Sequence, residues 1–128
     1  MLYGVEIYAN TFDTYLDRLR KLNNKILRIM QNQPKRSHVF DLYKNYNLLP
    51  LDSLHNHQLL IFVFKCMYYS QLVPSAFHDY FIFNRQIHTY NTRMYNDLHI
   101  FAPNTLYKKR TIKYKCSILW NCLPDKIF

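Results

Sequence analysis

Residues 51–72 (LDSLHNHQLLIFVFKCMYYSQL) are the stretch that most restricts how this chain folds. From Leu59 to Tyr69 the stretch is apolar except for Lys65. A helix that is apolar on all sides is a buried helix, and this run is too short to cross a bilayer. Its β-branched and aromatic residues also favour a strand, but its length without Gly or Pro exceeds that of a usual strand. The sequence therefore predicts a central helix over residues 51–72, buried on every side and wrapped by the other segments.

The composition is that of a folded, basic protein. Hydrophobic residues make up 49% and aromatic residues 17% of the 128 positions, which argues against disorder and predicts a single domain over residues 1–128. The formal net charge is +9, with only eight carboxylates. This excess is typical of proteins that bind a polyanion such as nucleic acid or an anionic membrane, and it also suits a basic protein without such a partner.

The cysteines and the N-terminal stretch indicate which cofactors and which cellular compartment to expect. Cys66, Cys116 and Cys122 have neither the spacing of metal ligands nor the even number of a disulfide framework. We therefore expect no metal and no cofactor. Cys66 lies in the predicted core helix as a reduced thiol, which fits an intracellular protein of the nucleus or cytoplasm. No signal peptide or transmembrane segment is predicted, so we expect no membrane partner.

Two helices are predicted before the central one. Asn10 or Thr11 is expected to cap a helix over residues 12–31, and Ser37 a shorter helix over residues 37–46. The first of these helices carries apolar residues at three- and four-residue steps, a pattern that predicts a face turned toward the core. This stripe consists of Phe12, Tyr15, Leu19, Leu22, Ile26 and Met30.

The C-terminal half has a weaker helical pattern. Pro74 or Ser75 is expected to begin a short helix, and residues 83–104 have no helical period and predict an extended, ordered loop. Parts of residues 97–101 and 110–114 are expected to pair as short strands. The predicted fold class is therefore mainly α: a compact helical domain around one central buried helix, with an extended loop and a short β-hairpin near the C-terminus.

Two groups of basic residues are candidate nucleic-acid contacts. The first follows one flank of the 12–31 helix, as a solvated face or as a strip that tracks phosphates, and consists of Arg18, Lys21, Lys25 and Arg28. The second is interleaved with aromatic residues in the segment 107–115 and consists of Lys108, Lys109, Arg110, Lys113 and Lys115. Such interleaving is typical of nucleic-acid surfaces, and equally of an edge strand whose lysines prevent aggregation.

Several short motifs occur in a fixed order along the chain. YGVEIY at residues 3–8 is similar to a "YGxExW" stretch, and residues 16–29 to an "LxxLQxRxxRxI" helix. Residues 74–93 and 119–124 follow the pattern "P..F..YF..N..IH.YNTR…LWN.LP". The ordered set resembles the region that follows the polymerase domain in reverse transcriptases of non-LTR (LINE-type, jockey-like) retrotransposons. The resemblance covers essentially the whole chain.

The resemblance implies a fragment of a larger protein, without catalysis of its own. Polymerisation needs clustered aspartates that hold Mg²⁺, whereas the aspartates here are scattered and no YxDD-type turn exists. In that family the region is thought to help hold RNA or DNA during RNA-directed DNA synthesis. The implied partners are RNA or DNA, bound weakly and without sequence preference, together with the upstream polymerase domain or a second copy of the chain. The alternative is a protein–protein scaffold or a domesticated remnant with no nucleic-acid role.

The YNTR segment permits two interpretations. It is either a ligand clamp in which Arg93 contacts an anion, or a structural knot in which Asn91 and Arg93 bond loop carbonyls beneath Trp120. The near absence of glycine favours the knot, because side chains must then satisfy the backbone of the loop. The residues assigned to this structural motif are Tyr90, Asn91, Thr92, Arg93, Trp120, Asn121 and Pro124.

Overall fold

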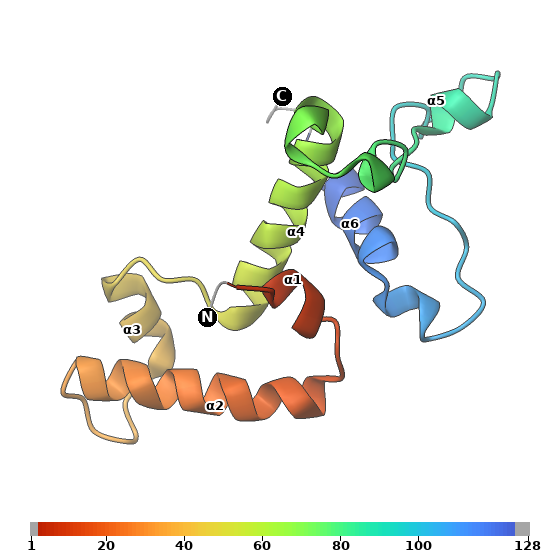
Figure 1. The fold of residues 1–128 in the computed structure, drawn as a ribbon. Coiled ribbons are helices and arrows are strands. Elements are labelled where there is room, and N and C mark those ends of the chain that lie inside the picture. The colour runs from red at the N-terminus through yellow and green to blue at the C-terminus, as the bar shows by residue number, and fades with distance from the viewer. Residues whose placement is uncertain (1–2, 125–128) are drawn as a thin grey trace. The chain divides into compact units, whose positions relative to one another are not determined.

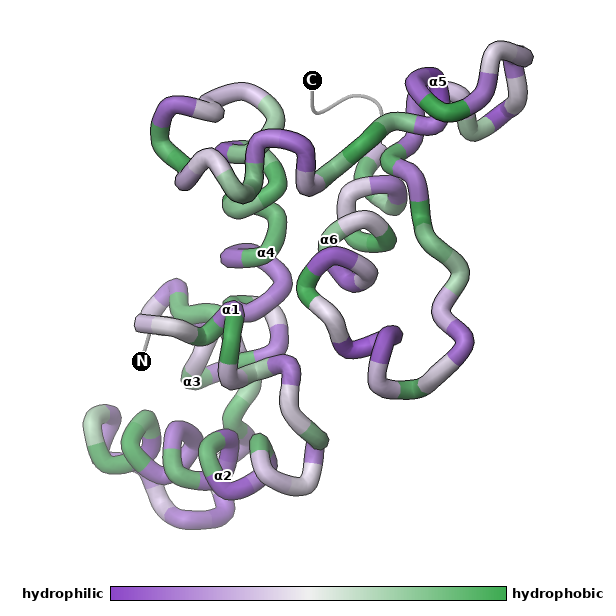
Figure 2. The backbone as a smooth tube through the Cα atoms, turned by 45° about the vertical axis from the view of Figure 1, so that its right-hand side comes forward, coloured by the Kyte–Doolittle hydropathy of each residue, from purple (hydrophilic) through white to green (hydrophobic). Residues whose placement is uncertain are grey.

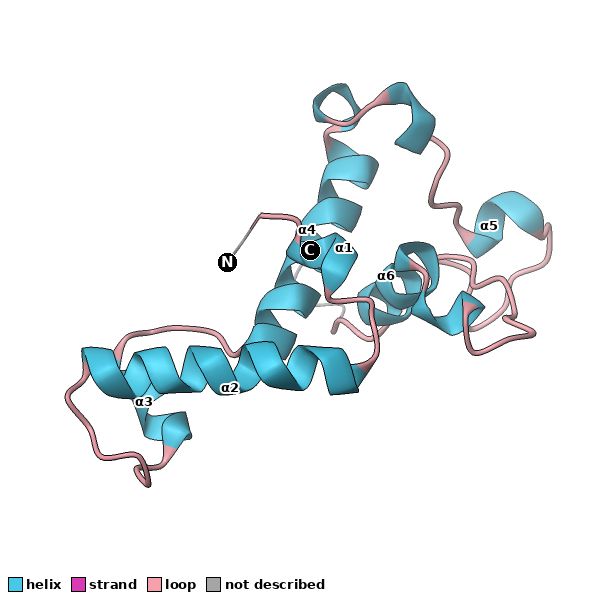
Figure 3. Ribbon diagram, turned by 60° about the horizontal axis from the view of Figure 1, so that its bottom comes forward, coloured by secondary structure: helices cyan, strands magenta, loops and turns pink. Residues whose placement is uncertain are grey.

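The structure is a computed structural model that describes residues 3–124. Its α-helices are α1 (Val5–Tyr8), α2 (Asp13–Met30), α3 (Val39–Asn45), α4 (Leu51–Tyr68), α5 (Asn84–Ile87) and α6 (Ile112–Asn121) (Figure 1). Single 3₁₀ turns are η1 (Ser70–Leu72), η2 (Ser75–Phe77) and η3 (Lys108–Arg110). No strand occurs between residues 3 and 124 (Figure 3), so the predicted mainly-α fold class is confirmed. Within this range no helix is long and apolar enough to cross a membrane.

The chain divides into two compact units, one ending at His55 and the other beginning at Asn56. The boundary falls inside α4, whose first turn belongs to unit 1 and whose remainder belongs to unit 2. Each unit has its own cluster of buried side chains. The expectation of one domain over residues 1–128 stays a prediction.

Unit 1 is built on α2. Its core joins Leu16 of α2 to Val5 and Ala9 of the N-terminal segment and to Leu51 at the start of α4. Helix α3 contacts α2, and the Gln31 side chain donates a hydrogen bond to the Leu42 carbonyl at 2.9 Å. This side-chain contact fixes the end of α2 against α3.

Unit 2 has the larger core. Buried residues from α4, from the loop segments and from α6 meet in one cluster: Leu59, Val63, Cys66, Phe81, Leu98 and Cys116. Phe62 adds edge-to-face contacts with the rings of Phe77, Tyr80 and Phe81 at centroid distances of 5.3–6.3 Å. Trp120 packs against this core and is half-buried. The aromatic residues of the C-terminal half therefore fold back onto α4.

Helix α4 differs from its prediction in length and in burial. It ends at Tyr68, and a 3₁₀ turn follows. Its buried positions form one stripe at steps of four, four, four and three residues, namely Leu51, His55, Leu59, Val63 and Cys66. Phe64 is 38% and Tyr68 56% exposed, so the prediction of burial on every side is wrong. Apolar residues continue around the later turns of the helix (Figure 2), but the segments that pack on it bury only one stripe.

Helix α2 has nearly the predicted length but buries a different face. Leu16 and Leu27 are buried and Leu19 is half-buried. The other predicted core positions (Phe12, Tyr15, Leu22, Ile26 and Met30) are 40–70% exposed, so the predicted inward stripe is wrong. The segments that pack on α2 in unit 1 bury the face beside the predicted one. On this face Leu16 and Leu27 lie three turns apart.

The predicted caps of the first helices are also corrected. Phe12, rather than Asn10 or Thr11, is the N-cap residue of α2. His38 is that of α3, because the Ser37 hydroxyl instead donates to the Pro34 carbonyl at 2.8 Å. Neither N-cap side chain bonds the helix backbone.

Three predictions for the C-terminal half are corrected. The helix expected from Pro74 or Ser75 is only the turn η2. The predicted strand at 110–114 is helical, because the Thr111 side chain accepts a hydrogen bond from the Tyr114 N–H and caps α6. The predicted partner strand at 97–101 contributes one antiparallel bridge, Phe83 with Leu98, and the predicted loop contains α5.

Candidate nucleic-acid interface

The first basic group lies along one side of α2, in unit 1. Arg18, Lys21, Lys25 and Arg28 follow three- and four-residue steps, and the first three are exposed. Lys21 pairs with Asp17 at 3.0 Å, and Arg28 lies 3.4 Å from the Ser37 carbonyl. The Lys21 ammonium lowers the pKa of the Asp17 carboxyl by a hydrogen bond and by its charge. Arg18 and Lys25 have no ion pair with the described residues and are therefore the two cations available to phosphates.

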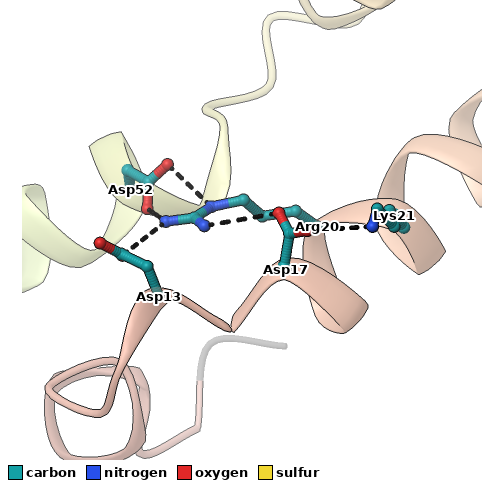
Figure 4. A network of polar contacts seen from close by, with 5 residues as sticks. All are labelled: Asp13, Asp17, Arg20, Lys21 and Asp52. Atoms are coloured by element: carbon teal, nitrogen blue, oxygen red, sulfur yellow. Dashed lines mark hydrogen bonds and ion pairs between the residues drawn. The ribbon is translucent and has the colours of Figure 1, made fainter. Parts of the chain in front are cut away.

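Arg20 lies on another side of α2 and forms ion pairs with three nearby carboxylates (Figure 4). Its guanidinium donates two hydrogen bonds to Asp52, at 2.6 and 3.1 Å, and one to Asp13 at 3.2 Å, with Asp17 at 3.9 Å. These bonds raise the pKa of Arg20. A two-bond guanidinium–carboxylate pair fixes orientation as well as distance. The cluster therefore joins α2 to the first turn of α4 and leaves Arg20 little capacity for a ligand.

The second basic group is distributed over η3 and α6, in unit 2. Lys108 and Lys109 are exposed, whereas Arg110, Lys113 and Lys115 are half-buried. Lys113 and Lys115 are two residues apart on a helix and point in different directions. The five cations therefore do not form one face, as an alternating strand would require. Lys108 and Lys113 nevertheless come together at one cavity.

This first cavity has a volume of about 270 Å³ and combines cations with aromatic rings. It is lined by His99, Ile100, Phe101, Ala102, Pro103, Lys108, Thr111, Lys113, Tyr114 and Ser117. The Lys113 ammonium lies 4.7 Å from the centre of the Phe101 ring and 5.2 Å from that of Tyr80. An ammonium over a ring face keeps N–H donors for a further partner.

A row of four rings leads away from this cavity. The centroids of Tyr90 and His88 are 5.3 Å apart, those of His88 and His99 6.3 Å, and those of His99 and Phe101 4.6 Å. Tyr90 is 62% and Phe101 55% exposed. We call this set the ring row. It comes from two segments, 88–90 and 99–101, each with rings at alternate positions.

Two asparagines of the sequence motif fix the His99 part of the ring row. The Asn121 side chain accepts from the Leu98 N–H and donates to the Leu98 carbonyl, both at 2.9 Å. The Asn84 amide donates to the Met94 carbonyl at 2.8 Å and accepts from His99 Nδ1 at 2.9 Å. Because a carbonyl oxygen only accepts, Nδ1 of His99 carries the proton. The backbone before His99 and the ring itself are thus both fixed.

A second cavity, of about 510 Å³, adjoins the first through shared residues His99 and Ile100. It is lined by Asn84, His88, Tyr90, Thr92, Arg93, Met94, Leu98, His99, Ile100 and Asn121. Arg93 and Asn91 are exposed and form no hydrogen bond with the described residues. The predicted knot is therefore made by Asn84 and Asn121 instead. Of the other motif residues, Trp120 packs on the core and Pro124 is exposed beyond α6.

The sequence prediction missed several residues of this region. His88, His99, Phe101 and Asn84 were not assigned to a site, although two of them belong to the motif. The available signal was the H-x-Y spacing at 88–90 and the H-x-F spacing at 99–101. In an extended segment, residues two apart point to the same side.

The side chains of this region differ in reactivity. Between residues 3 and 124 no group of three or more His, Cys, Asp or Glu side chains could hold a metal ion. Burial raises the pKa of the Cys66 thiol and raises that of Cys116 to about 12, which keeps both thiols protonated and unreactive. What the surface offers is positive charge, exposed rings and amide groups.

The chain was compared with models of protein families, with curated proteins and with solved structures, and none of them matches it.

Proposed function

We propose that this chain is a non-catalytic nucleic-acid-binding segment of the kind that follows the polymerase domain in a non-LTR retrotransposon reverse transcriptase. Its contribution would be to hold RNA or DNA, with little sequence preference, while a separate polymerase domain carries out RNA-directed DNA synthesis. The motif order along the chain supports the family, and the charge and rings of unit 2 support the activity.

One observation carries the proposal: the charge of residues 80–124. This segment has seven Lys and Arg residues and a single carboxylate, Asp97. Arg93, Lys108 and Lys113 form no ion pair with the described residues. Unit 1 differs, because its carboxylates are more numerous and pair with Arg20 and Lys21. Unpaired cations beside exposed aromatic rings are the features that bind single strands without reading sequence.

The proposal is tested by the salt dependence of binding. Each cation that contacts a phosphate of a single strand contributes about 0.7 to the slope of log K against log salt. The variant Arg93→Gln/Lys108→Gln/Lys113→Gln is expected to flatten that slope by roughly 2, measured by fluorescence anisotropy with labelled RNA.

The matched control is Arg18→Gln/Lys21→Gln/Lys25→Gln, with the same loss of charge on α2. A slope changed only by this control would move the binding surface to α2. If the wild-type chain does not bind RNA or DNA at low salt, the proposal is wrong. The family assignment has its own test, which is whether a YxDD-type polymerase is encoded upstream of Met1 in the same reading frame.

A second candidate function, a protein–protein scaffold, is favoured by the exposed side of α2. Apolar residues recur there at alternating steps of three and four: Phe12, Tyr15, Leu19, Leu22, Ile26 and Ile29. All except Leu19 are 40–70% exposed. This spacing is the seam of a coiled coil, and a contiguous exposed apolar surface marks an interaction site. The expected partners are a second copy of the chain or the upstream polymerase domain.

A further inference from the structure

The ring row is not needed for the core of unit 2. Tyr90 and Phe101 are more than half exposed, and His88 is exposed as well. Yet the middle of the row is fixed, because the side chains of Asn84 and Asn121 bond the His99 ring and the backbone of Leu98 next to it. Loop residues with exposed rings and a fixed backbone form a prepared surface rather than a packing element.

The two cavities beside the ring row are suited to an anion. None of the residues that line them is a carboxylate. Their cations are Arg93 in the larger cavity and Lys108 and Lys113 in the smaller one. His99 and Ile100 line both, so the two cavities adjoin at His99. Rings of the row and cations therefore line the same two cavities.

We propose that the ring row is a stacking platform for the bases of a single-stranded nucleic acid, whose phosphates contact Arg93, Lys108 and Lys113. This site rests on the proposed nucleic-acid binding and specifies its ligand: single strands rather than duplexes. Base stacking on Tyr90, His88 and Phe101 needs unpaired bases, because a duplex keeps the faces of its bases covered. The ring row is therefore expected to distinguish single strands from duplexes without recognising a particular sequence.

Stacking and phosphate contacts make separable contributions, which allows a sharp test. The variant Tyr90→Leu/Phe101→Leu removes two exposed rings while it keeps apolar side chains of similar reach. A stacked base is worth enough that each lost ring is expected to weaken binding about tenfold. The slope of log K against log salt should stay at its wild-type value, because no charge is removed.

The experiment uses the full chain and a labelled RNA of mixed sequence, about 12 nucleotides long, either single-stranded or as a duplex of equal length. The control variant is Tyr46→Leu, which removes an exposed tyrosine of unit 1. The wild-type chain is expected to bind the single strand more tightly than the duplex, and the double variant to lose this preference. Circular dichroism of each variant verifies that it is folded.

A second measurement does not depend on mutation. Photocrosslinking with 5-iodouridine RNA, followed by mass spectrometry, is expected to label Tyr90, His88 or Phe101. If the double variant binds single strands as the wild type does, and crosslinks lie elsewhere, the stacking platform is wrong while salt-dependent binding still supports the proposed function. Equal loss of single-strand and duplex binding also overturns the platform. No binding by the wild type overturns both proposals.

Discussion

Asn121 shows how one side chain supports both the fold and the candidate site. Its amide pairs with the N–H and the carbonyl of Leu98, a residue only 1% exposed. A buried backbone group without a partner costs about 1–3 kcal/mol. We expect Asn121→Ala to lower the free energy of unfolding by at least about 2 kcal/mol, measured as a shift of the urea midpoint.

The controls for Asn121 separate pairing from packing. Asn121→Asp keeps the oxygen that accepts from the Leu98 N–H but loses the donor to the Leu98 carbonyl, so it should also destabilise. Asn91→Ala removes an exposed amide of the same motif and should change stability by no more than about 0.5 kcal/mol. Equal effects of Asn121→Ala and Asn91→Ala would contradict the role of the Leu98 pairing.

Cys116 makes stability depend on pH in the alkaline range. Burial raises its pKa from 9.0 to about 12, so the folded chain holds the thiol proton more tightly than the unfolded chain does. Stability from this group is therefore complete below pH 9 and is lost between pH 9 and about 12, by at most about 1.4 kcal/mol per pH unit. The raised pKa of Cys66 acts in the same direction.

The test compares urea unfolding of the wild type and of Cys116→Ala at a series of pH values. The variant loses packing at every pH, but its stability should fall less steeply above pH 9. Parallel curves for the two proteins across that range would show that the thiol does not contribute to the pH dependence.

At the scale of elements, the start of α6 is stabilised by its N-cap residue, Thr111. The Thr111 hydroxyl accepts from the Tyr114 N–H at 3.4 Å and donates to the Lys108 carbonyl at 2.7 Å. Loss of an N-cap hydroxyl costs about 1 kcal/mol. Thr111→Ala should lower the unfolding midpoint accordingly, whereas Thr111→Ser should restore most of it. If serine does not rescue, the effect belongs to the lost methyl group and not to the cap.

The helices show which sequence patterns were sufficient to predict secondary structure. Periodicity predicted α2 and α4 within a few residues, because long helices repeat the pattern many times. It did not predict which face of α2 is buried, because an apolar stripe does not show which other segment packs against the helix. Residues 112–115 alternate apolar or aromatic with basic residues too briefly to separate strand from helix, and the Thr111 cap decides between them.

The candidate site was predictable only in part, for a related reason. Lys108 and Lys113 were identified from charge, and Tyr90 and Arg93 from the motif. Their assembly depends on Asn84 and Asn121, which reach across 15 and 23 residues to His99 and Leu98. No local pattern encodes such contacts, so the ring row emerges only once both segments are placed.

At the scale of the whole molecule, charge and apolar surface oppose each other. The net charge of +9 repels a second copy, while the exposed apolar side of α2 attracts one. Salt separates the two, because the screening length falls from about 10 Å at 0.1 M to about 3 Å at 1 M. Screening weakens the repulsion between copies and also weakens binding to RNA. Self-association and nucleic-acid binding should therefore respond to salt in opposite directions.

Sedimentation velocity at tens of micromolar is expected to show a mean mass that rises with salt, while RNA affinity falls over the same series. The variant Leu22→Gln/Ile26→Gln should stay monomeric throughout and bind RNA as the wild type does, since both positions are exposed and lie outside the basic groups. Its partner control is Lys108→Gln/Lys109→Gln, which should reduce RNA affinity and ease self-association. A wild type that is monomeric at every salt concentration would remove the support for a scaffold. A mass that falls as salt rises would instead assign self-association to charge, because contacts between apolar side chains are not weakened by screening.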